Sequence, residues 1–379
     1  MRKIVIAIDS FKGTLTSRQA GEAAAHGVAD AMPAVELSVV PVADGGEGTV
    51  QAVITGLGGE MVECNVQGPL GETVKSSYGL CGDMAVIEIA AASGLTLIKA
   101  EQRNPWLTSS YGTGELIRDA LLRGCRNILI GLGGSATNDA GFGMLSALGY
   151  RFLDANGCEL TASGGACARV ASIDDSAVLP QLKEARFTVA CDVNNPLTGP
   201  YGASHVFGPQ KGADAAMIAK LDGALSYFAN VTASYLGHDF SNEKGAGAAG
   251  GLGFAIKAYL RGSLTSGVDM VLDALRFNEI IRDADLIITG EGRIDGQTCM
   301  GKTPGGVLRR GIARNIPVIA VGGSVDETAI EELMNAGFSA VFPIVAGPLT
   351  LQEAMKPEVA SRNLQRTVAQ LLRAISLRI

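Results

Sequence analysis

NILIGLGGSATNDAGFG, residues 127–143, combines two kinds of sequence in one short segment. An apolar run typical of a buried strand, Asn127–Leu132, ends in glycines and in small hydroxyl and acidic residues, and an apolar helix is expected to begin near Met144. Glycine lets backbone N–H groups approach a phosphate closely, and the N-terminus of a helix attracts negative charge. The segment therefore predicts an anion-binding loop between a strand and a helix.

Strands and helices alternate at both ends of the chain. Near the N-terminus the predicted elements are the strands Lys3–Asp9 and Glu36–Ala43 and the helices Ser17–Ala31 and Thr49–Leu57. Near the C-terminus they are the strands Asp285–Thr289, Pro317–Gly322 and Ala340–Val345 and the helices Gly305–Arg314, Glu327–Asn335 and Glu358–Ser376. This alternation predicts parallel pairing, and hence a doubly wound, Rossmann-like sheet whose two halves lie far apart in the sequence.

The pattern changes between these halves. Short strands separated by turn residues are predicted at Glu60–Val66, Thr73–Gly79 and Ala85–Ile89, which indicates an antiparallel excursion. Further strands (Asn127–Leu132, Arg186–Asp192) and helices (Glu115–Arg123, Ala215–Leu236, Gly251–Arg261) follow. We therefore expect an α/β protein in which residues 1–62 and 284–379 form a discontinuous Rossmann-like domain and residues 63–283 form an inserted α/β domain with a mixed sheet.

Composition narrows the class of protein. The 379 residues carry a net charge of −7 and no long basic run, which argues against a nucleic-acid partner. The seven cysteines are odd in number and form no C-x-x-C pair, so neither a disulfide framework nor a zinc site is indicated. No apolar stretch approaches the roughly 20 residues of a membrane span, and the N-terminal apolar run is too short for a secretory signal. We expect a cytoplasmic protein without a membrane partner.

Loops with charged residues, three of them containing glycine, follow four of the predicted strands: Asp9–Thr14, Ala43–Thr49, Asp192–Pro196 and Gly290–Asp295. In parallel sheets, ligands bind beyond the carboxyl ends of the strands. Carboxylates combined with Lys and Arg on such loops suit phosphoryl transfer, in which carboxylates hold Mg²⁺ and accept a proton while cations and N–H groups neutralise phosphate. Each acidic residue could instead be a helix N-cap, but four acidic strand ends together favour a functional site.

Two glycine motifs admit other interpretations. Gly131–Ala136 fits the dinucleotide fingerprint G-x-G-x-x-A, but no clear acidic ribose partner ends a second strand about 20 residues later, which disfavours a nicotinamide cofactor. Gly296–Thr303 fits the phosphate-loop pattern G-x-x-x-x-G-K-[ST]. Because the apolar core of the preceding strand stops at Thr289, a standard phosphate loop is disfavoured there, although Lys302 stays a candidate ligand for phosphate or carboxylate.

Eight segments along the chain together resemble the bacterial glycerate kinases of the type I family. They are DSFKGTLTS (9–17), PVADGGEGT (41–49), GTGELI (112–117), IGLGGSATNDAG (130–141), CDVNNPLTGPYGAS (191–204), FGPQKGA (207–213), GAGAAGGLGF (245–254) and TGEGRIDGQTCMGKTPGGV (289–307). The resemblance implies two α/β domains and ATP- and Mg²⁺-dependent phosphorylation of D-glycerate. Family members commonly carry a small polar residue at the position of Gly296, so the phosphate-loop match reflects a single substitution.

Site residues follow from these loops and from the chemistry of glycerate, which has one carboxylate and two hydroxyl groups. ATP is expected at Gly133, Gly134, Ser135 and Thr137, with Gly45 and Gly46, and Mg²⁺ at Asp44 or Asp192. Substrate binding is expected from Lys12, Arg293 or Lys302 for the carboxylate, with Ser10 and Asn138. Asp192 or Asp9 is expected to accept the hydroxyl proton, with Lys12 as a further catalytic residue.

The expected product is 2-phosphoglycerate. The alternatives are 3-phosphoglycerate or another sugar acid as the substrate of a related kinase. A nicotinamide-dependent oxidoreductase and a non-catalytic sugar-acid sensor are the competing classes, although no helix-turn-helix or basic segment supports a sensor. We leave a homodimer open as the assembly.

Overall fold

In the computed structural model, which describes residues 1–377, the chain divides into two units. Unit 1 comprises residues 1–44, 51–57 and the C-terminal part from Gly267, and unit 2 comprises residues 45–50 and 58–266. Helix α2, Thr49–Leu57, is shared between them. Among residues 1–377, no helix is both long and apolar enough to cross a membrane.

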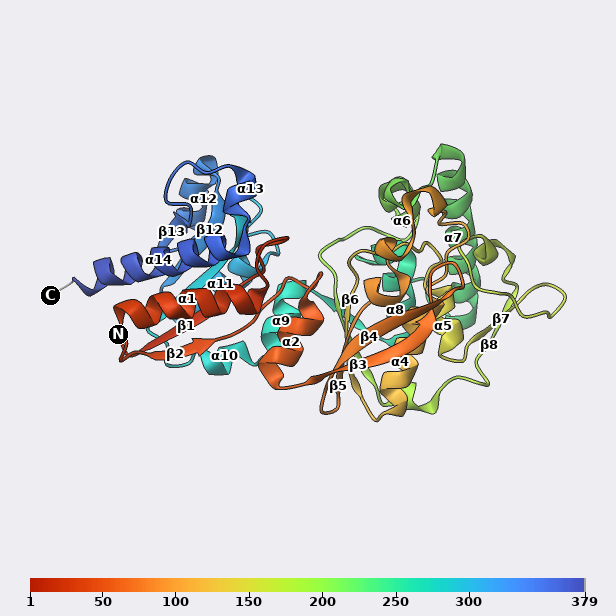
Figure 1. Ribbon diagram of the computed structural model, residues 1–379. Helices are drawn as coiled ribbons and strands as arrows, with labels where there is room; N and C mark the ends of the chain where they lie inside the picture. Colours follow the sequence, from red (N-terminus) through yellow and green to blue (C-terminus); the bar gives the residue numbers. More distant parts are fainter. Residues whose placement is uncertain (378–379) are drawn as a thin grey trace. The chain divides into compact units, whose positions relative to one another are not determined.

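Unit 1 contains a five-stranded, wholly parallel sheet (Figure 1). Its strands, in spatial order, are β13 (Ala340–Pro343), β12 (Val318–Val325), β11 (Leu286–Ile294), β1 (Lys3–Ile8) and β2 (Glu36–Val39). Ile4 to Ile8 of β1 are all buried, as a strand covered on both faces requires. The direction of winding reverses between β1 and β11, which makes their carboxyl ends the switch point of the sheet.

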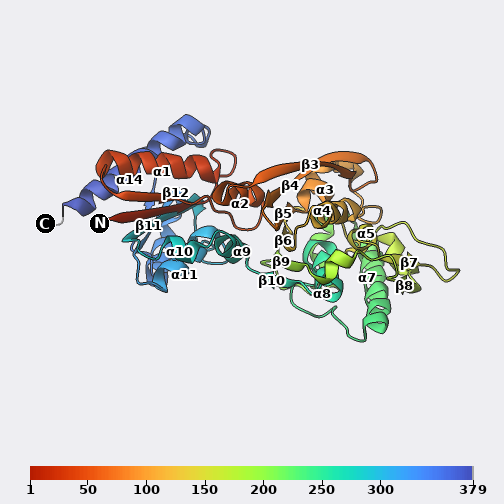
Figure 2. The same cartoon turned by 90° about the horizontal axis from the view of Figure 1, so that it is seen from below.

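Helices cover both faces of this sheet. Helices α1 (Ser17–Ala31) and α14 (Pro357–Ser376) lie on one face, and α9 (Gly267–Ala274), α10 (Phe277–Ile280) and α11 (Thr303–Ile312) lie on the other (Figure 2). The remaining helices of the unit are α12 (Ile330–Ala336) and α13 (Leu351–Ala354). Helices α1 and α14 approach closely at Gly27, where an added Cβ would lie 2.3 Å from the carbonyl oxygen of Gln365. The predicted doubly wound α/β fold is confirmed.

Unit 2 contains a six-stranded mixed sheet. In spatial order its strands are β10 (Ser263–Thr265), β9 (Arg186–Ala190), β6 (Asn127–Gly131), β5 (Met84–Glu88), β4 (Thr73–Cys81) and β3 (Glu60–Gln67). The pairs β3–β4 and β4–β5 are antiparallel, which matches the predicted antiparallel excursion, and the other three pairs are parallel. A separate two-stranded antiparallel sheet pairs β7 (Arg151–Leu153) with β8 (Ser172–Asp174). The helices are α3 (Ala90–Ser93), α4 (Tyr111–Leu122), α5 (Phe142–Ala147), α6 (Ala203–Phe207), α7 (Ala215–Leu236) and α8 (Leu252–Leu260).

The unit boundaries differ from those expected at 62/63 and 283/284. Residues 58–62 belong to unit 2, because β3 pairs with β4 from its first residue, Glu60 opposite Leu80. Residues 267–283 belong to unit 1, because α9 packs against α11: an added Cβ at Gly306 would lie 2.4 Å from Cγ2 of Val268.

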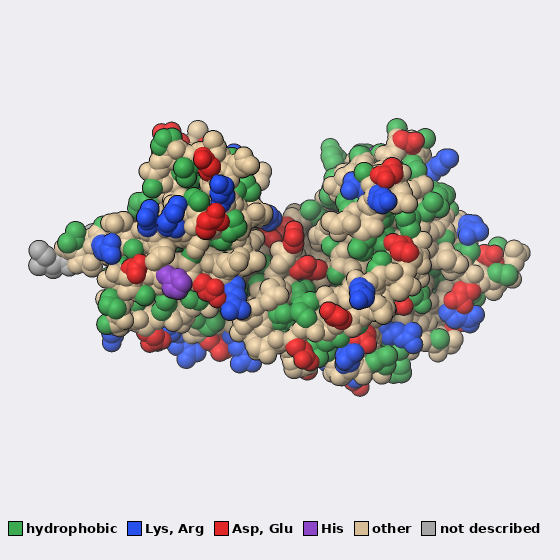
Figure 3. Space-filling view, viewed as in Figure 1, with side chains coloured by type: hydrophobic (Ala, Val, Ile, Leu, Met, Phe, Trp, Pro, Cys, Tyr) green, Lys and Arg blue, Asp and Glu red, His purple; other side chains and the backbone are tan. Residues whose placement is uncertain are grey.

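On the face shown in Figure 3, acidic and basic side chains are mixed over each unit.

Candidate active site

A pocket of about 510 Å³ lies at the switch point of the unit 1 sheet. Its lining includes Glu291, Gly292 and Arg293, which lie where β11 runs on to Ile294, beyond its last pair with β1, Gly290 opposite Ile8. Pairing with β12 supports this extension, with Glu291 opposite Gly322. The expected end of this strand at Thr289 is therefore wrong. The charged and hydroxyl side chains that line the pocket are Asp9, Ser10, Lys12, Thr14, Asp44, Glu291, Arg293, Asp295, Lys302 and Ser324.

Asp9 is the most buried carboxylate of this pocket, with 8% of its surface exposed. Its Oδ1 accepts a hydrogen bond from the backbone N–H of Ser10 (2.6 Å), and its Oδ2 accepts one from the hydroxyl group of Thr303. Burial raises the pKa of Asp9 to about 6, the Thr303 hydrogen bond opposes this rise, and the nearby charge of Asp44 adds to it. A carboxylate with a pKa near neutrality suits a general base.

Glu291 is the second partly buried carboxylate, and it is held on both oxygens. Oε1 accepts a hydrogen bond from the Thr298 hydroxyl (2.8 Å), and Oε2 lies 3.6 Å from Nζ of Lys302. Burial raises its pKa, although Thr298 and Lys302 oppose the rise. Nζ of Lys302 also lies 3.2 Å from Oδ1 of Asp295, whose pKa is lowered because hydrogen bonds and the charge of Lys302 outweigh its desolvation. The positive charge of Lys302 thus offsets the negative charges of Glu291 and Asp295 inside the pocket.

Lys12 and Arg293 reach the pocket from its exposed side. Nζ of Lys12 lies 3.9 Å from Oδ2 of Asp44, and 75% of the lysine side chain is exposed. Nε of Arg293 lies 3.7 Å from Oδ2 of Asp295, and 71% of its side chain is exposed. The structure therefore brings together the predicted residues Asp9, Ser10, Lys12, Asp44, Arg293 and Lys302 in one pocket. Long, exposed cations of this kind can turn toward an anionic ligand.

The loop from Gly296 to Lys302 connects β11 directly to α11, which is the strand–loop–helix context of a phosphate loop. The expectation that this strand stops too early for a phosphate loop is therefore wrong. Part of the loop is bonded within itself: the N–H of Gln297 donates to Oδ1 of Asp295, and the N–H of Met300 donates to the carbonyl oxygen of Gln297. Nζ of Lys302 contacts the carboxylates of Glu291 and Asp295, so we do not assign the phosphates of a nucleotide to this segment.

The glycine loop of unit 2, residues 132–141, connects β6 to α5. The loop and the end of β6 pack against residues 45–50. An added Cβ at Gly131 would lie 2.6 Å from the carbonyl oxygen of Gly45, and one at Gly133 would lie 3.7 Å from Cα of Gly46. Gly133 and Gly134 are exposed, whereas Ser135 is buried and forms an isolated antiparallel β-bridge with Gly94. The structure thus brings the predicted cofactor residues Gly45, Gly46, Gly133, Gly134 and Ser135 to one place.

At the N-terminus of helix α5, where the sequence predicts a bound anion, the N–H groups bind a carboxylate of the protein, that of Asp139. Asp139 is fully buried, and its carboxylate accepts hydrogen bonds from the backbone N–H groups of Gly141 and Gly143 (both 3.1 Å). Ser110 donates to it from both its N–H and its hydroxyl group (both 2.8 Å). Helix α5, which is only six residues long, therefore has no N-terminal amides to offer a phosphate, and this part of the prediction is corrected.

Thr137 and Asn138 are also fully enclosed. Nδ2 of Asn138 donates to Oγ of Ser204 (2.9 Å), and the carbonyl oxygen of Thr137 accepts a hydrogen bond from Nζ of Lys211 (2.7 Å). Lys211 is itself buried, which lowers the pKa of its ammonium group to about 7. Neither Thr137 nor Asn138 is exposed to a ligand in this conformation, so the exposed part of the loop is Gly133 and Gly134.

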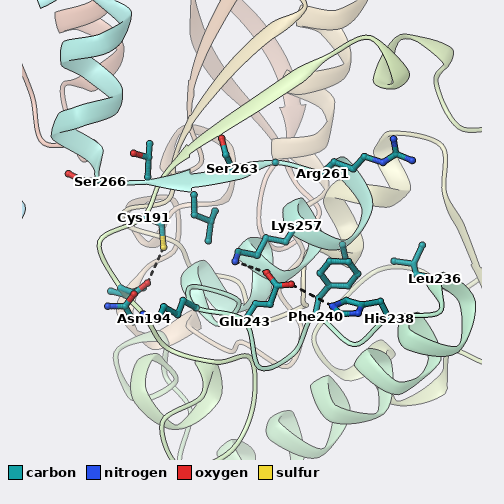
Figure 4. A pocket seen from close by; sticks show the side chains of 16 residues that line it. Cys191, Asn194, Leu236, His238, Phe240, Glu243, Lys257, Arg261, Ser263 and Ser266 are labelled. Atoms are coloured by element: carbon teal, nitrogen blue, oxygen red, sulfur yellow. Dashed lines mark hydrogen bonds and ion pairs between the residues drawn. The ribbon is translucent and has the colours of Figure 1, made fainter.

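Asp192 lies just beyond the carboxyl end of β9, and its side chain is exposed. Its neighbours Cys191, Val193 and Asn194 line a second pocket, of about 860 Å³, which lies within unit 2 (Figure 4). Asp192 belongs to unit 2 and Asp44 to unit 1. Within residues 1–377, no group of three or more His, Cys, Asp or Glu side chains is arranged to hold a metal ion.

Comparison with known proteins decides the family. The family model described as "Glycerate kinase family" matches residues 4–376. The chain belongs to this family. The resemblance inferred from the eight segments is thereby confirmed.

Two glycerate kinases and one solved structure match this glycerate kinase family member over nearly their full length. It is 48% identical over 377 residues to a glycerate kinase of Bacillus subtilis (strain 168), covering 99% of this chain and 98% of the relative. It is 47% identical over 374 residues to the glycerate 2-kinase of Escherichia coli (strain K12), covering 97% and 98%. A crystal structure from Salmonella typhimurium LT2, described as a candidate glycerate kinase 2, matches with a TM-score of 0.91 at 45% identity and covers 99% of this chain and 98% of that one.

Four residues of this family member went unassigned in the sequence analysis: Thr303, Glu291, Lys211 and Glu88. Glu88 ends β5, and its Oε1 accepts a hydrogen bond from the N–H of Val50 (3.0 Å), which fixes residues 45–50 beside the glycine loop. Burial raises its pKa, and backbone hydrogen bonds oppose that rise. An acidic residue inside the apolar run MAVIEIA was the available signal for Glu88.

Proposed function

We propose that this chain transfers a phosphoryl group from ATP, with Mg²⁺, to the 2-hydroxyl group of D-glycerate. The family supports a glycerate kinase, and one relative is named a glycerate 2-kinase. The observation that carries the proposal is the unit 1 pocket, where a buried carboxylate with a pKa of about 6 lies among Lys12, Arg293 and Lys302. A small hydroxy acid needs this combination: cations for its carboxylate and a base for its hydroxyl group.

We assign the roles by burial and charge. Asp9 accepts the hydroxyl proton, because its carboxylate is held in place by Ser10 and Thr303 and its pKa lies close to neutrality. Lys302, Arg293 and Lys12 bind the carboxylate of glycerate. Asp192 stays the alternative base and a candidate metal ligand, because its carboxylate is exposed at the end of a parallel strand.

Gly133, Gly134 and Ser135, together with Gly45 and Gly46, are the proposed phosphate-binding residues of unit 2. The exposed glycines leave backbone surface accessible to a ligand. Mg²⁺ in kinases takes one or two carboxylates and completes its octahedron with phosphate oxygens and water, so Asp44 or Asp192 fits it without a preformed cluster of protein ligands. Bound Mg²⁺ would neutralise charge on the transferred phosphate. A cytoplasmic location and a homodimer stay predictions.

Lys302→Met is expected to raise the KM for D-glycerate about thirtyfold and to change kcat less. The reason is the loss of a charge-assisted hydrogen bond to the substrate carboxylate, worth about 2 kcal/mol. Steady-state kinetics at saturating ATP measure the effect. Lys356→Met is the matched control, because both lysines are the N-cap residue of a helix, α11 and α14 respectively, and Lys356 is exposed. Equal KM values in the two variants would remove Lys302 from the substrate site.

The decisive experiment is to incubate the purified protein with ATP, Mg²⁺ and D-glycerate and to follow ADP. The product is assigned by coupling to enolase with and without phosphoglycerate mutase, and we expect signal without the mutase. Signal only with the mutase would assign the 3-phosphate. Glycerate binding without ADP formation would indicate a sensor, and a nicotinamide-linked absorbance change would indicate an oxidoreductase.

A further inference from the structure

The second pocket belongs to unit 2 alone and has no role in the chemistry assigned above. Its wall is formed by the chain after β9, by strand β10 and by helix α8, with the end of α7 and the loop that follows it on the opposite side (Figure 4). At about 860 Å³, it is large enough for a drug-sized ligand. The residues that follow the carboxyl end of β9 line it, together with strand β10 along its whole length, from Ser263 to Thr265.

The charge of this pocket differs from that of the whole chain. Its lining contains the cations Lys244, Lys257 and Arg261 and one carboxylate, Glu243, whereas the chain carries a net charge of −7. Oε2 of Glu243 lies 2.7 Å from Nζ of Lys257, and Oε1 lies 3.7 Å from Nε2 of His238 (Figure 4). The excess of positive charge attracts a ligand that is anionic as a whole, whichever of its groups enters the pocket, and the carboxylate provides an acceptor for hydroxyl groups.

The other side chains of the lining suit a planar, partly apolar chemical group. Leu236, Phe240 and Leu264 contribute apolar surface, and the rings of His238 and Phe240 meet edge to face with centroids 4.6 Å apart. Within the described residues, 1–377, strand β10 lies at the edge of the sheet and pairs with β9 alone. At its end, Oγ of Ser266 is buried and has no hydrogen-bond partner among the described residues. A planar heterocycle with donors and acceptors on its edge would use such groups.

Sheet order connects this pocket with the glycine loop. Ala190 of β9 pairs with Thr265 of β10 on one side and with Gly131 of β6 on the other. Strands lie about 4.8 Å apart, so the ends of β10 and β6 are separated by roughly 10 Å along one edge of the sheet. A single extended ligand can therefore occupy the pocket and reach the exposed glycines Gly133 and Gly134.

We propose that this pocket binds the base and ribose of the purine nucleotide, with the phosphates directed toward the loop after β6. The inference rests on the proposed kinase function and names the site of its nucleotide. Glu243 accepts hydrogen bonds from ribose hydroxyl groups, and the apolar side chains contact the base.

Ser263→Trp tests the proposal, because Ser263 is an exposed residue of β10 that lines the pocket, and aromatic residues suit strands. Calorimetric titration with ADP is expected to show a dissociation constant at least about thirtyfold higher than in the unmodified protein. Titration with tripolyphosphate is expected to be unchanged. Ser172→Trp, at an exposed serine of β8 in the same unit, is the matched control and is expected to bind ADP normally. Unchanged ADP affinity in a folded Ser263→Trp variant would overturn the proposal.

A second measurement needs no variant. Photolabelling of the unmodified protein with 8-azido-ADP, followed by peptide mapping, is expected to mark residues within 236–244 or 257–266. Labelling confined to unit 1 peptides would overturn the assignment even if Ser263→Trp failed to fold. Because ADP formation by the unmodified protein is measured separately, loss of this site and loss of the kinase function are distinguishable.

Discussion

Asp9→Asn is expected to lower kcat by about a thousandfold while leaving the protein folded. General bases contribute about 10² to 10⁴ to rate, and the asparagine amide cannot accept the proton. The substitution fits the site, because Oδ1 can still accept from the N–H of Ser10 and the amide can donate to the hydroxyl of Thr303, which is able to reverse its hydrogen bond. Pre-steady-state and steady-state rates of ADP formation measure the loss.

The same variant has an opposite effect on stability. The pKa of Asp9 is about 6 in the folded protein, above its ordinary value of 3.8, so ionisation is disfavoured by folding. The contribution of this group to stability is complete below about pH 4 and is lost as the pH rises through about 6. Asn does not ionise, so at pH 8 the variant is expected to be more stable by up to about 3 kcal/mol. Urea unfolding at pH 4 and pH 8 measures this difference.

A pH profile separates the base role from a structural one. In the unmodified protein kcat should fall below about pH 6, because protonated Asp9 cannot accept a proton. Thr303→Val is the control: it keeps the carboxylate but removes a hydrogen bond that lowers its pKa, so the acid limb should move to higher pH. An acid limb that stays in place in Thr303→Val, or nearly full activity in Asp9→Asn, would contradict the assignment.

Local signals in the sequence were sufficient for the long helices. The structure places α1, α2 and α7 at the residues predicted for them. Helix α1 begins after Thr16, whose side chain accepts from the N–H of Gln19 while the Gln19 side chain accepts from the N–H of Thr16. Helix α7 is capped by Asp214 and ends at Gly237 in the left-handed region (φ 75°). Capping chemistry depends on neighbouring residues only, so it can be recognised without the fold.

Features that depend on contacts between distant segments of the chain could not be predicted from these local signals. Strand β11 continues through Gly290 and Glu291 because β12 pairs with it, although these residues end the apolar run. The buried environment of Lys211 depends on packing with segments distant in the sequence, such as Thr137. The charged residues around Asp9 were predictable, since carboxyl ends of parallel strands converge, whereas the partners that set its pKa, among them Thr303, were not.

The glycine loop shows the limit of reasoning from a motif. The pattern of glycines before an apolar helix predicts an anion at the helix N-terminus, and an anion is present there: the carboxylate of Asp139. The same N–H groups cannot serve both this carboxylate and a phosphate. An acidic residue within the loop segment was the signal in the sequence that the helix N-terminus could be capped internally.

Asp192→Asn is expected to lower kcat at least about a hundredfold, whether its carboxylate holds Mg²⁺ or accepts the proton, because both roles need its charge. The fold should be unaffected, since the side chain is exposed and lies outside the strand. Activity measured over a range of Mg²⁺ concentrations separates the roles: partial recovery at high Mg²⁺ indicates a metal ligand, and no recovery indicates a base. Asp175→Asn is the matched control, an exposed aspartate of the same unit whose contact with the hydroxyl of Tyr235 an asparagine oxygen can keep. Turnover by Asp192→Asn equal to that of the control would exclude Asp192 from both roles.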